Sequence, residues 1–234
     1  MKKESTQGRG RSWLRWTLFM IGLIVMSFGI ALMIRADLGV APWDVLHIGL
    51  TNQIGFTVGT WSILMGLIIL AISGWIMKAW PQIGAFINML LVGVFIDLFM
   101  WILPTPDGIL LKFLMLILGI LIIGYGIGLY IAPGCGAGPR DSLMLALTMK
   151  TGWKVQRVRG VMEIIVLSVG WLLGGPVFIG TLLFCFGIGS VVGMTLPQCQ
   201  RFTDFIMERG TKYENLNEGT LRSHHHDGVS EEIR

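Results

Sequence analysis

Two stretches of the sequence decide the fold: Gly39-Val-Ala-Pro42-Trp43-Asp44-Val-Leu-His47 and Gly136-Ala-Gly138-Pro139-Arg140-Asp141-Ser-Leu-Met144, which begins 97 residues later. Both follow the pattern Gly-x-x-Pro-x-Asp and continue into an apolar run. Glycine permits a sharp backbone turn, and proline is favoured in the first position of a helix. An aspartate two residues further lies in the first turn, where its charge suits the helix dipole. Each stretch therefore predicts the start of a helix.

The similarity between the two stretches extends well beyond these motifs. Residues 29–58 and 126–155 align without a gap and are identical at 12 of 30 positions. Matches of leucine or isoleucine mean little in an apolar chain, but matches of Gly, Pro, Asp and Thr are informative. A repeat of this kind is the first feature to establish in a sequence. We expect the chain to contain two copies of one unit of roughly 97 residues.

Charge is scarce in the middle of the chain, which indicates a membrane protein. Charged residues make up 14% of the sequence, against about 25% in soluble domains. Of the 32 charges, only 14 lie within residues 16–200. A membrane-spanning helix needs about 20 apolar residues. The sequence predicts an all-α membrane protein with about six such spans: 16–34, 58–77, 83–103, 109–131, 158–175 and 177–196.

The two motif-led apolar runs, 42–51 and 139–149, are too short to cross a bilayer. They favour two re-entrant half-helices. Three spans lie between them, which places them on opposite membrane faces. The first repeat, 16–103, and the second, 109–197, then form a 3+3 inverted repeat, an architecture common in transporters. An alternative with eight crossings stays open, in which both short helices traverse the membrane.

The distribution of basic residues predicts the orientation in the membrane. A basic N-terminus, residues 1–15, precedes the first span, and a polar tail, 198–234, follows the last, with partial disorder expected after Lys212. With six spans, all basic residues except Arg35 and Lys112 lie on one side or, as Arg159 does, just inside the span that starts there, and the positive-inside rule makes this side cytoplasmic. We expect a multi-pass protein of a bacterial plasma membrane with both termini in the cytoplasm.

The motif side chains are the candidate substrate-binding residues. Helix starts that line a cavity between the halves offer N–H groups to an anion, and Arg140 would add bidentate hydrogen bonds. Asp44 and His47 lie three residues apart on one helix face, where they could carry a proton or bind a cation. Trp43 and Asp141 complete the predicted site. The alternative is that both aspartates only cap helices and that the arginine pairs with Asp141 or lipid phosphate.

Two further acidic residues lie within predicted spans. Asp97 is deep in the third span and is also a candidate binding residue, because a charge there needs a polar partner or a cavity. Glu163 lies in the fifth span, where pairing with Arg159, one turn earlier, explains it.

Several function classes have no support in the sequence. The three cysteines have no metal-type spacing, and we expect no metal site and no cofactor. No nucleophile elbow, His-Glu metal motif or phosphate-binding loop is present, so an enzyme is not expected. The net charge of +4 comes from basic residues beside apolar spans, which suits lipid contact and not nucleic acid. The expected partners are the bilayer and a small molecule or ion, and a homo-oligomer stays open.

The motifs together resemble a known family. The run Gly39 to Leu50, followed by Gly55-x-Thr57-x-Gly59-Thr60-Trp61-Ser62, is similar to the YczE/YyaS group of bacterial membrane proteins, related to the YitT family. The run Gly136 to Met144 is the second hallmark, with Ser142 where glycine is more frequent. The resemblance covers roughly residues 12–200. It implies an integral membrane protein and supplies no substrate.

The sequence leaves two functions from different classes. The inverted repeat and the two charged half-helices favour a small-molecule transporter or permease with a polar site between the halves. The alternative is a non-transporting membrane partner, or assembly factor, for another protein. The first needs a cavity and the second needs a docking surface.

Overall fold

The computed structural model describes the backbone of residues 7–226 and the side chains of residues 12–207. Within residues 7–226 the chain is all helical, and eight helices follow one another without a strand. Their bounds are α1 Gln7–Ala36, α2 Pro42–Ile54, α3 Val58–Met77, α4 Ile83–Ile102, α5 Ile109–Ile131, α6 Pro139–Thr151, α7 Val155–Leu172 and α8 Ile179–His226.

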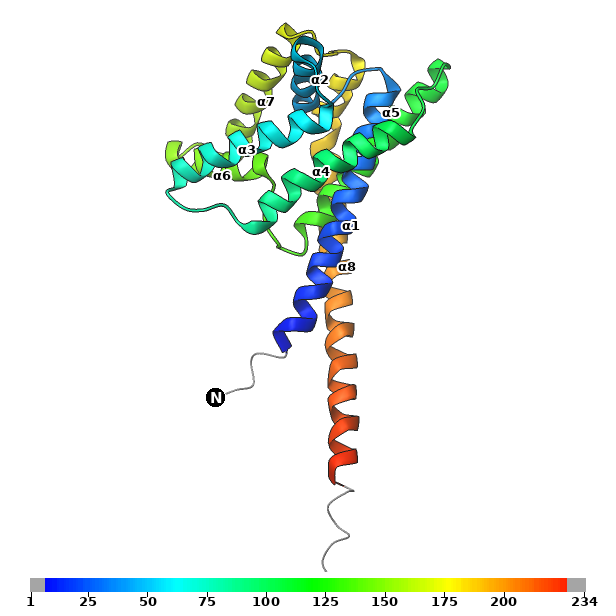
Figure 1. The fold of residues 1–234 in the computed structure, drawn as a ribbon, viewed down its shortest axis with the longest axis vertical. Helices are drawn as coiled ribbons and strands as arrows, with labels where there is room; N and C mark the ends of the chain where they lie inside the picture. Colours follow the sequence, from blue (N-terminus) through cyan, green and yellow to red (C-terminus); the bar gives the residue numbers. More distant parts are fainter. Residues whose placement is uncertain (1–6, 227–234) are drawn as a thin grey trace, which may run out of the picture.

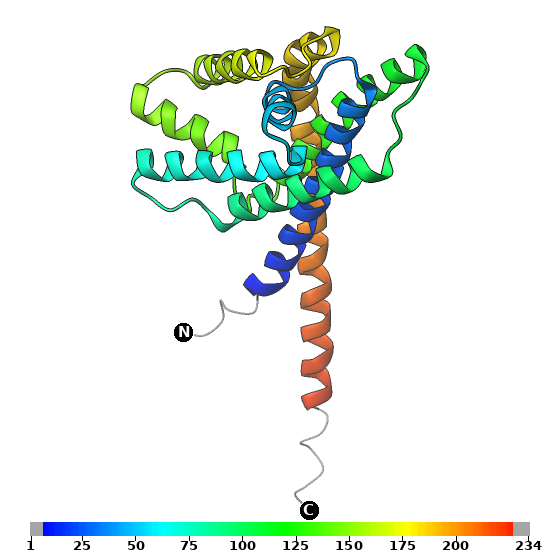
Figure 2. The ribbon, with the colours of Figure 1, turned by 45° about the horizontal axis from the view of Figure 1, so that its top comes forward.

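The two terminal helices set the long axis of the molecule. α1 and α8 run side by side, and α8 extends well beyond the other helices (Figure 1). α3 and α4 pack against each other and lie across this axis (Figure 2). The beginning of α1 and the end of α8 lie at the same end of the molecule in both views. A protein with both termini on one side of a membrane needs the beginning of its first helix and the end of its last helix at the same end.

Five helices of the described chain are long and apolar enough to cross a membrane, and they coincide with five of the six predicted spans. The sixth predicted span, 158–175, corresponds to α7, which begins and ends three residues earlier. α7 is not among the five, because its 18 residues include Arg157, Arg159 and Glu163. The structure therefore confirms a multi-pass helical membrane protein with five such helices.

The outer surface of the described helices is apolar, as a bilayer requires. Exposed large side chains occur on every long helix around α1, among them Leu67, Leu90, Leu118, Ile164 and Phe186. Soluble proteins rarely expose contiguous apolar surface on this scale. Five exposed tryptophans lie near helix ends, where their amphipathic rings suit the membrane–water interface. They are Trp75, Trp80, Trp101, Trp153 and Trp171.

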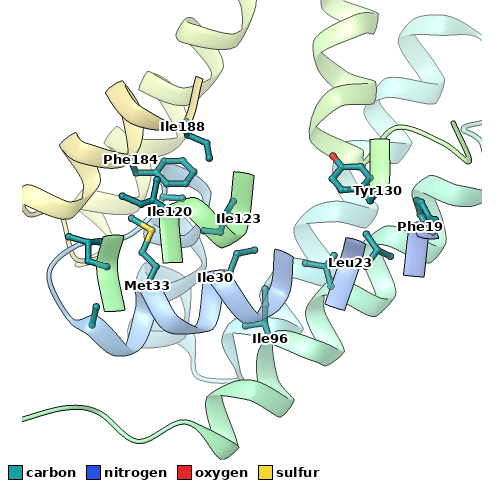
Figure 3. Close-up of a cluster of buried hydrophobic side chains, with 14 residues drawn as sticks. Phe19, Leu23, Ile30, Met33, Ile96, Ile120, Ile123, Tyr130, Phe184 and Ile188 are labelled. Atoms are coloured by element: carbon teal, nitrogen blue, oxygen red, sulfur yellow. The ribbon is translucent and has the colours of Figure 1, made fainter. Parts of the chain in front are cut away.

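The core lies where α1 packs against α4, α5 and α8 (Figure 3). In its most apolar segment 56% of α1 is buried, against 22% for α3. Phe19, Leu23 and Met33 of α1 are fully buried, with Ile96 of α4 and Leu116 of α5. α1 is therefore the central helix of the fold.

α1 and α5 pack antiparallel, in direct backbone contact at glycines. A Cβ atom added at Gly22 would lie 2.4 Å from the backbone nitrogen of Tyr130. One added at Gly126 would lie 2.5 Å from the backbone nitrogen of Met26. Rising residue numbers on α1 thus meet falling numbers on α5. Small residues permit this approach in membranes, where helices associate through close packing.

The two short helices, α2 and α6, begin after equivalent glycine turns. Gly39 and Gly136 have φ of 106° and 148°, a region that favours glycine. Each turn lies against the start of a spanning helix. A Cβ atom at Gly180 would lie 2.8 Å from the Gly39 carbonyl oxygen, and one at Gly84 would lie 3.1 Å from the Gly136 nitrogen. α2 then packs against α7, and α6 packs against α3.

Both ends of the chain are more helical than the sequence predicted. α1 already begins at Gln7, within the predicted basic N-terminus. α8 continues to His226, whereas partial disorder was expected after Lys212. The only proline inside α8 is Pro197, and the tail beyond it contains many good helix formers such as Glu, Leu, Lys and Arg. Residues 227–234, the end of the predicted tail, lie outside the described residues.

The close contact of α1 with α5 gives a stability prediction. Replacing Gly126 by alanine places a methyl group within 2.5 Å of the Met26 backbone, which cannot move away as a side chain could. We expect Gly126→Ala to lower the free energy of unfolding by about 1–3 kcal/mol. Thermal unfolding in detergent measures this change.

Gly189 of α8 is the matched control, because a Cβ atom there meets nothing within 4 Å. Gly189→Ala should be neutral or stabilising, since alanine is the better helix former by about 1 kcal/mol. Equal thermal midpoints for the two variants would contradict the packing of α1 on α5.

Candidate functional site

A cavity of about 200 Å³ lies in the middle of the bundle, and residues from all eight helices line it. Most of its surface is apolar, but titratable and amide side chains from five helices also reach it. These are Asp44 and His47 of α2, Asn88 of α4, Tyr130 of α5, Arg140 and Asp141 of α6, and Arg159 and Glu163 of α7. Titratable side chains inside a membrane bundle mark a functional site by default.

The two motifs meet in this cavity. The Arg140 Nη2 atom of α6 lies 3.8 Å from the Asp44 Oδ1 atom of α2. The Arg140 guanidinium carbon lies 5.1 Å from the centre of the Trp43 ring, a cation–π contact. Residues of both motifs are therefore needed to form these two contacts. Arg140 thus forms an ion pair across the two motifs, whereas the alternative interpretation paired it with Asp141 or lipid phosphate.

Asp44 and His47 form the most buried polar group of the site. Each is only 2% exposed, and the Asp44 Oδ1 and His47 Nδ1 atoms lie 3.5 Å apart. Among the described residues neither atom has a hydrogen-bond partner, and the same holds for the Asn88 Nδ2 atom. Buried polar atoms are rarely left unpaired, because each costs about 1–3 kcal/mol. Three such atoms around one cavity indicate that a ligand or water completes them.

The other two carboxylates of the cavity are already paired. The Tyr130 hydroxyl donates a hydrogen bond of 2.8 Å to Asp141 Oδ2. Arg159 Nε donates one of 2.9 Å to Glu163 Oε1, which confirms the predicted pair on α7. Neither short helix has a side-chain hydrogen bond at its N-cap. The N-cap residues are Ala41 and Gly138, which carry no side-chain acceptor, and Asp44 and Asp141 lie in the first turn of each helix, where their charge suits the helix dipole.

Asp97, a predicted binding residue, lies outside the cavity. Its Oδ2 atom accepts a hydrogen bond of 2.5 Å from the Thr57 hydroxyl, and its Oδ1 atom accepts one of 2.8 Å from the Gly59 N–H. Both partners belong to the beginning of α3. Asp97 thus supplies an acceptor and a negative charge to the positive end of that helix from a neighbouring helix.

The two basic residues that departed from the predicted charge distribution are both paired. Arg35 donates hydrogen bonds to the Thr105 hydroxyl and to the Met100 carbonyl oxygen. Lys112 Nζ lies 3.1 Å from Asp37 Oδ2. Neither Arg35 nor Lys112 lines the cavity.

Besides Arg159 and Glu163, three polar residues of the cavity were not predicted as part of the site. Tyr130 lies at the end of the fourth predicted span, Asn88 lies in the third, and Ser62 lies in the second. Spacing could not reveal them, because each reaches the cavity from a different helix. The only signal was their polarity inside a span. Among the side chains described, no three His, Cys, Asp or Glu residues are placed to hold a metal ion.

These observations define a class, a multi-pass helical membrane protein with a central cavity that charged side chains reach. The chain belongs to the family described as "Family of unknown function (DUF6198)", which matches residues 13–197. No solved structure matches the chain.

Three bacterial relatives support this membership. The chain is 44% identical over 199 residues to the uncharacterized membrane protein YczE of Bacillus subtilis (strain 168), covering 85% of this chain and 93% of that one. It is 33% identical over 177 residues to an uncharacterized protein of Haemophilus influenzae, covering 75% and 80%. It is 28% identical over 192 residues to YyaS of Bacillus subtilis, covering 80% and 95%. The resemblance to the YczE/YyaS group is confirmed.

The position of Asp97 gives the second prediction. Asp97→Ala removes both acceptors, so the Thr57 hydroxyl and the Gly59 N–H lose their partner. We expect the free energy of unfolding to fall by about 1–3 kcal/mol. Asp97→Asn keeps one carbonyl acceptor and should lose less, and thermal unfolding of both variants in detergent measures the difference. Unchanged stability in both variants would show that Asp97 does not hold the start of α3.

Proposed function

We propose that the protein is a small-molecule transporter whose substrate site is the central cavity, and that it is not an enzyme. The observation that carries this proposal is the meeting of Asp44 and Arg140, from the starts of two short helices, inside an apolar bundle. In transporters with broken helices, substrates bind near the membrane midplane, where helix starts face a cavity between two structural repeats. This is an analogy of architecture, and the experiment below tests it.

The helix bounds support the two repeats of this proposal. α2 and α6 each have 13 residues, and they begin at Pro42 and Pro139, 97 residues apart. α3 and α7 begin at Val58 and Val155, the same distance apart. The helix contacts repeat in the same way: α2 packs against α7, and its equivalent α6 packs against α3, the equivalent of α7. Each short helix thus packs against a long helix of the other repeat.

The contacts between α1 and α5 support an inverted relation of the repeats. Gly126 meets Met26, and the equivalent residues, Gly29 and Ile123, meet in the same way. A two-fold axis that exchanges residue n with residue n + 97 explains this pairing. Because α1 and α5 are equivalent and antiparallel, the axis lies across the helices. We propose that it lies in the membrane plane, as in a 3+3 inverted repeat.

α7 serves as the sixth crossing in this arrangement. Its 18 residues extend about 27 Å, close to the hydrocarbon thickness of about 30 Å. Arg159 and Glu163 face the cavity and pair there, so they need not meet lipid. α2 and α6 would then be re-entrant half-helices that enter from opposite faces, with both chain termini in the cytoplasm of a bacterial cell.

The size of the cavity limits the substrate. An apolar cavity of about 150 Å³ holds benzene, and drug-sized ligands need about 300–1,000 Å³. At about 200 Å³ the site therefore suits a small metabolite or an ion with a few waters. A non-transporting assembly factor has no need for such a site, and this favours the transporter over the alternative.

A substrate-free accessibility experiment tests the transporter proposal. Ser62 lines the cavity, and cysteine is close to serine in size. In a chain whose native cysteines are replaced, Ser62→Cys should react with a small impermeant thiol reagent added to right-side-out vesicles and also with reagent added to inside-out vesicles. A transporter must expose its site to each side in turn, so both preparations should react, which mass spectrometry detects.

Ser73→Cys is the control, because Ser73 is 2% exposed and does not line the cavity. It should react from neither side. Reaction of Ser62→Cys from one side alone, or from neither, would contradict transport and favour the assembly factor.

A further inference from the structure

We propose that the central cavity takes a small zwitterion, such as an amino acid with a small or apolar side chain, with its ammonium group on Asp44 and its carboxylate on Arg140. This inference rests on the proposed function, because it assigns a ligand class to the same cavity. It depends on which charged groups of the cavity already take part in hydrogen bonds with protein side chains and which do not.

The three carboxylates of the cavity differ in whether they already accept a hydrogen bond from a protein side chain. Asp141 accepts the Tyr130 hydroxyl, and Glu163 accepts Arg159. Asp44 makes no hydrogen bond through Oδ1, which is buried and bounded by groups at 3.5 and 3.8 Å. An acceptor with this geometry calls for a strong donor, and an ammonium group supplies three. Asp44 is therefore the anionic end of the site.

The cationic end is Arg140. Its side chain is 39% exposed although it lies in the cavity wall, and no described residue accepts a hydrogen bond from it. Its guanidinium carbon lies 5.1 Å from the centre of the Trp43 ring, a contact that uses none of its N–H donors. A planar fork of this kind matches a carboxylate. The unpaired Asn88 Nδ2 atom, also in the cavity wall, is a further donor for the same group.

The balance of charge excludes simpler ligands. A multiply charged anion would face three carboxylates: Asp44, Asp141 and Glu163. A simple cation would contact Asp44 but would leave the N–H donors of Arg140 without an acceptor. Inside a membrane bundle such repulsion is weakly screened, and an unpaired charge is expensive. A ligand with one charge of each sign offers a hydrogen-bond donor to Asp44 Oδ1 and an acceptor to the N–H groups of Arg140, and it adds no net charge to the site.

The apolar part of the cavity suits a small hydrocarbon side chain. Met26, Ile30 and Met89 line it together with Phe184 and Ile188. An amino acid such as L-valine is about a third larger than benzene, which a cavity of about 150 Å³ accommodates. The wall chemistry and the volume of about 200 Å³ therefore agree on the same class.

Binding to matched compounds tests this inference. The full chain in lipid nanodiscs is titrated calorimetrically with glycine, L-alanine, L-proline and L-valine, and each is compared with analogues that lack the amino group or the carboxylate. For L-valine these are 3-methylbutanoate and 2-methylpropylamine. At least one amino acid should bind about tenfold or more tightly than both of its analogues, because each analogue lacks either the group that contacts Asp44 or the group that contacts Arg140.

Two variants then separate the ends of the ligand. Asp44→Asn should reduce the affinity for the amino acid to that for its deaminated analogue, whereas Arg140→Gln should reduce it to that for the decarboxylated one. These readouts are ratios measured on folded protein, so a general loss of stability does not imitate them. Asp37→Asn is the control, because Asp37 pairs with Lys112 away from the cavity and asparagine tolerates its positive φ.

Two results would overturn the inference. One is that no amino acid binds more tightly than its analogues. The other is that Asp44→Asn and Arg140→Gln weaken all three compounds equally. Either result leaves the transporter proposal intact if Ser62→Cys still reacts from both sides, whereas reaction from one side alone defeats that proposal whatever the ligand.

Discussion

The contact between Asp44 of α2 and Arg140 of α6 is the interaction on which the rest of the structure depends. Charged side chains are costly inside an apolar bundle unless a partner or a cavity accommodates them. His47 also lies near Asp44 on α2, but the ion pair of Asp44 with Arg140 joins the two short helices, so their starts lie at the same place. The glycine turns before each helix, the spanning helices that support those turns and the cavity itself all follow from this requirement.

The antiparallel pair of α1 and α5 provides the rigid frame for that meeting. At Gly22 and Gly126 the backbones approach so closely that even a methyl group does not fit. Hydrocarbon tails are as apolar as leucine, so bilayer helices associate through such contacts and through hydrogen bonds. Since α1 is also the most buried spanning segment, the other long helices pack around this pair and leave the cavity beside it.

Much of the fold could be predicted because it depends on local patterns. Apolar runs of span length gave α3, α4 and α5 almost to the residue, and the Gly-x-x-Pro-x-Asp motif gave the starts of α2 and α6. The membrane-spanning character of α7 was harder to predict. Its charges face the cavity, and a helix with this composition resembles a shorter or interfacial helix. α8 also continues past the last predicted span into the polar tail, whose composition alone does not distinguish a helix from a disordered chain.

The candidate site was predictable only in part, for a physical reason. The motif residues Trp43, Asp44, His47, Arg140 and Asp141 all line the cavity, since the helix starts that carry them converge there. Asp97 illustrates the limit: burial of a carboxylate demands partners, but sequence does not say whether they are a ligand or the N–H groups of a neighbouring helix. The pairing of Asp141 with Tyr130 likewise depends on tertiary packing that no spacing encodes.

The most direct test of the account is the side of the membrane on which each short helix ends. Ile54 and Thr151 are equivalent residues, 97 apart, at the exposed ends of α2 and α6. Each is replaced singly by cysteine in a chain without native cysteines, and intact cells are treated with an impermeant thiol reagent. An inverted repeat predicts labelling of Ile54→Cys from outside and of Thr151→Cys only after permeabilisation. Labelling of both from the same side would contradict opposed half-helices and remove the basis for a site between inverted repeats.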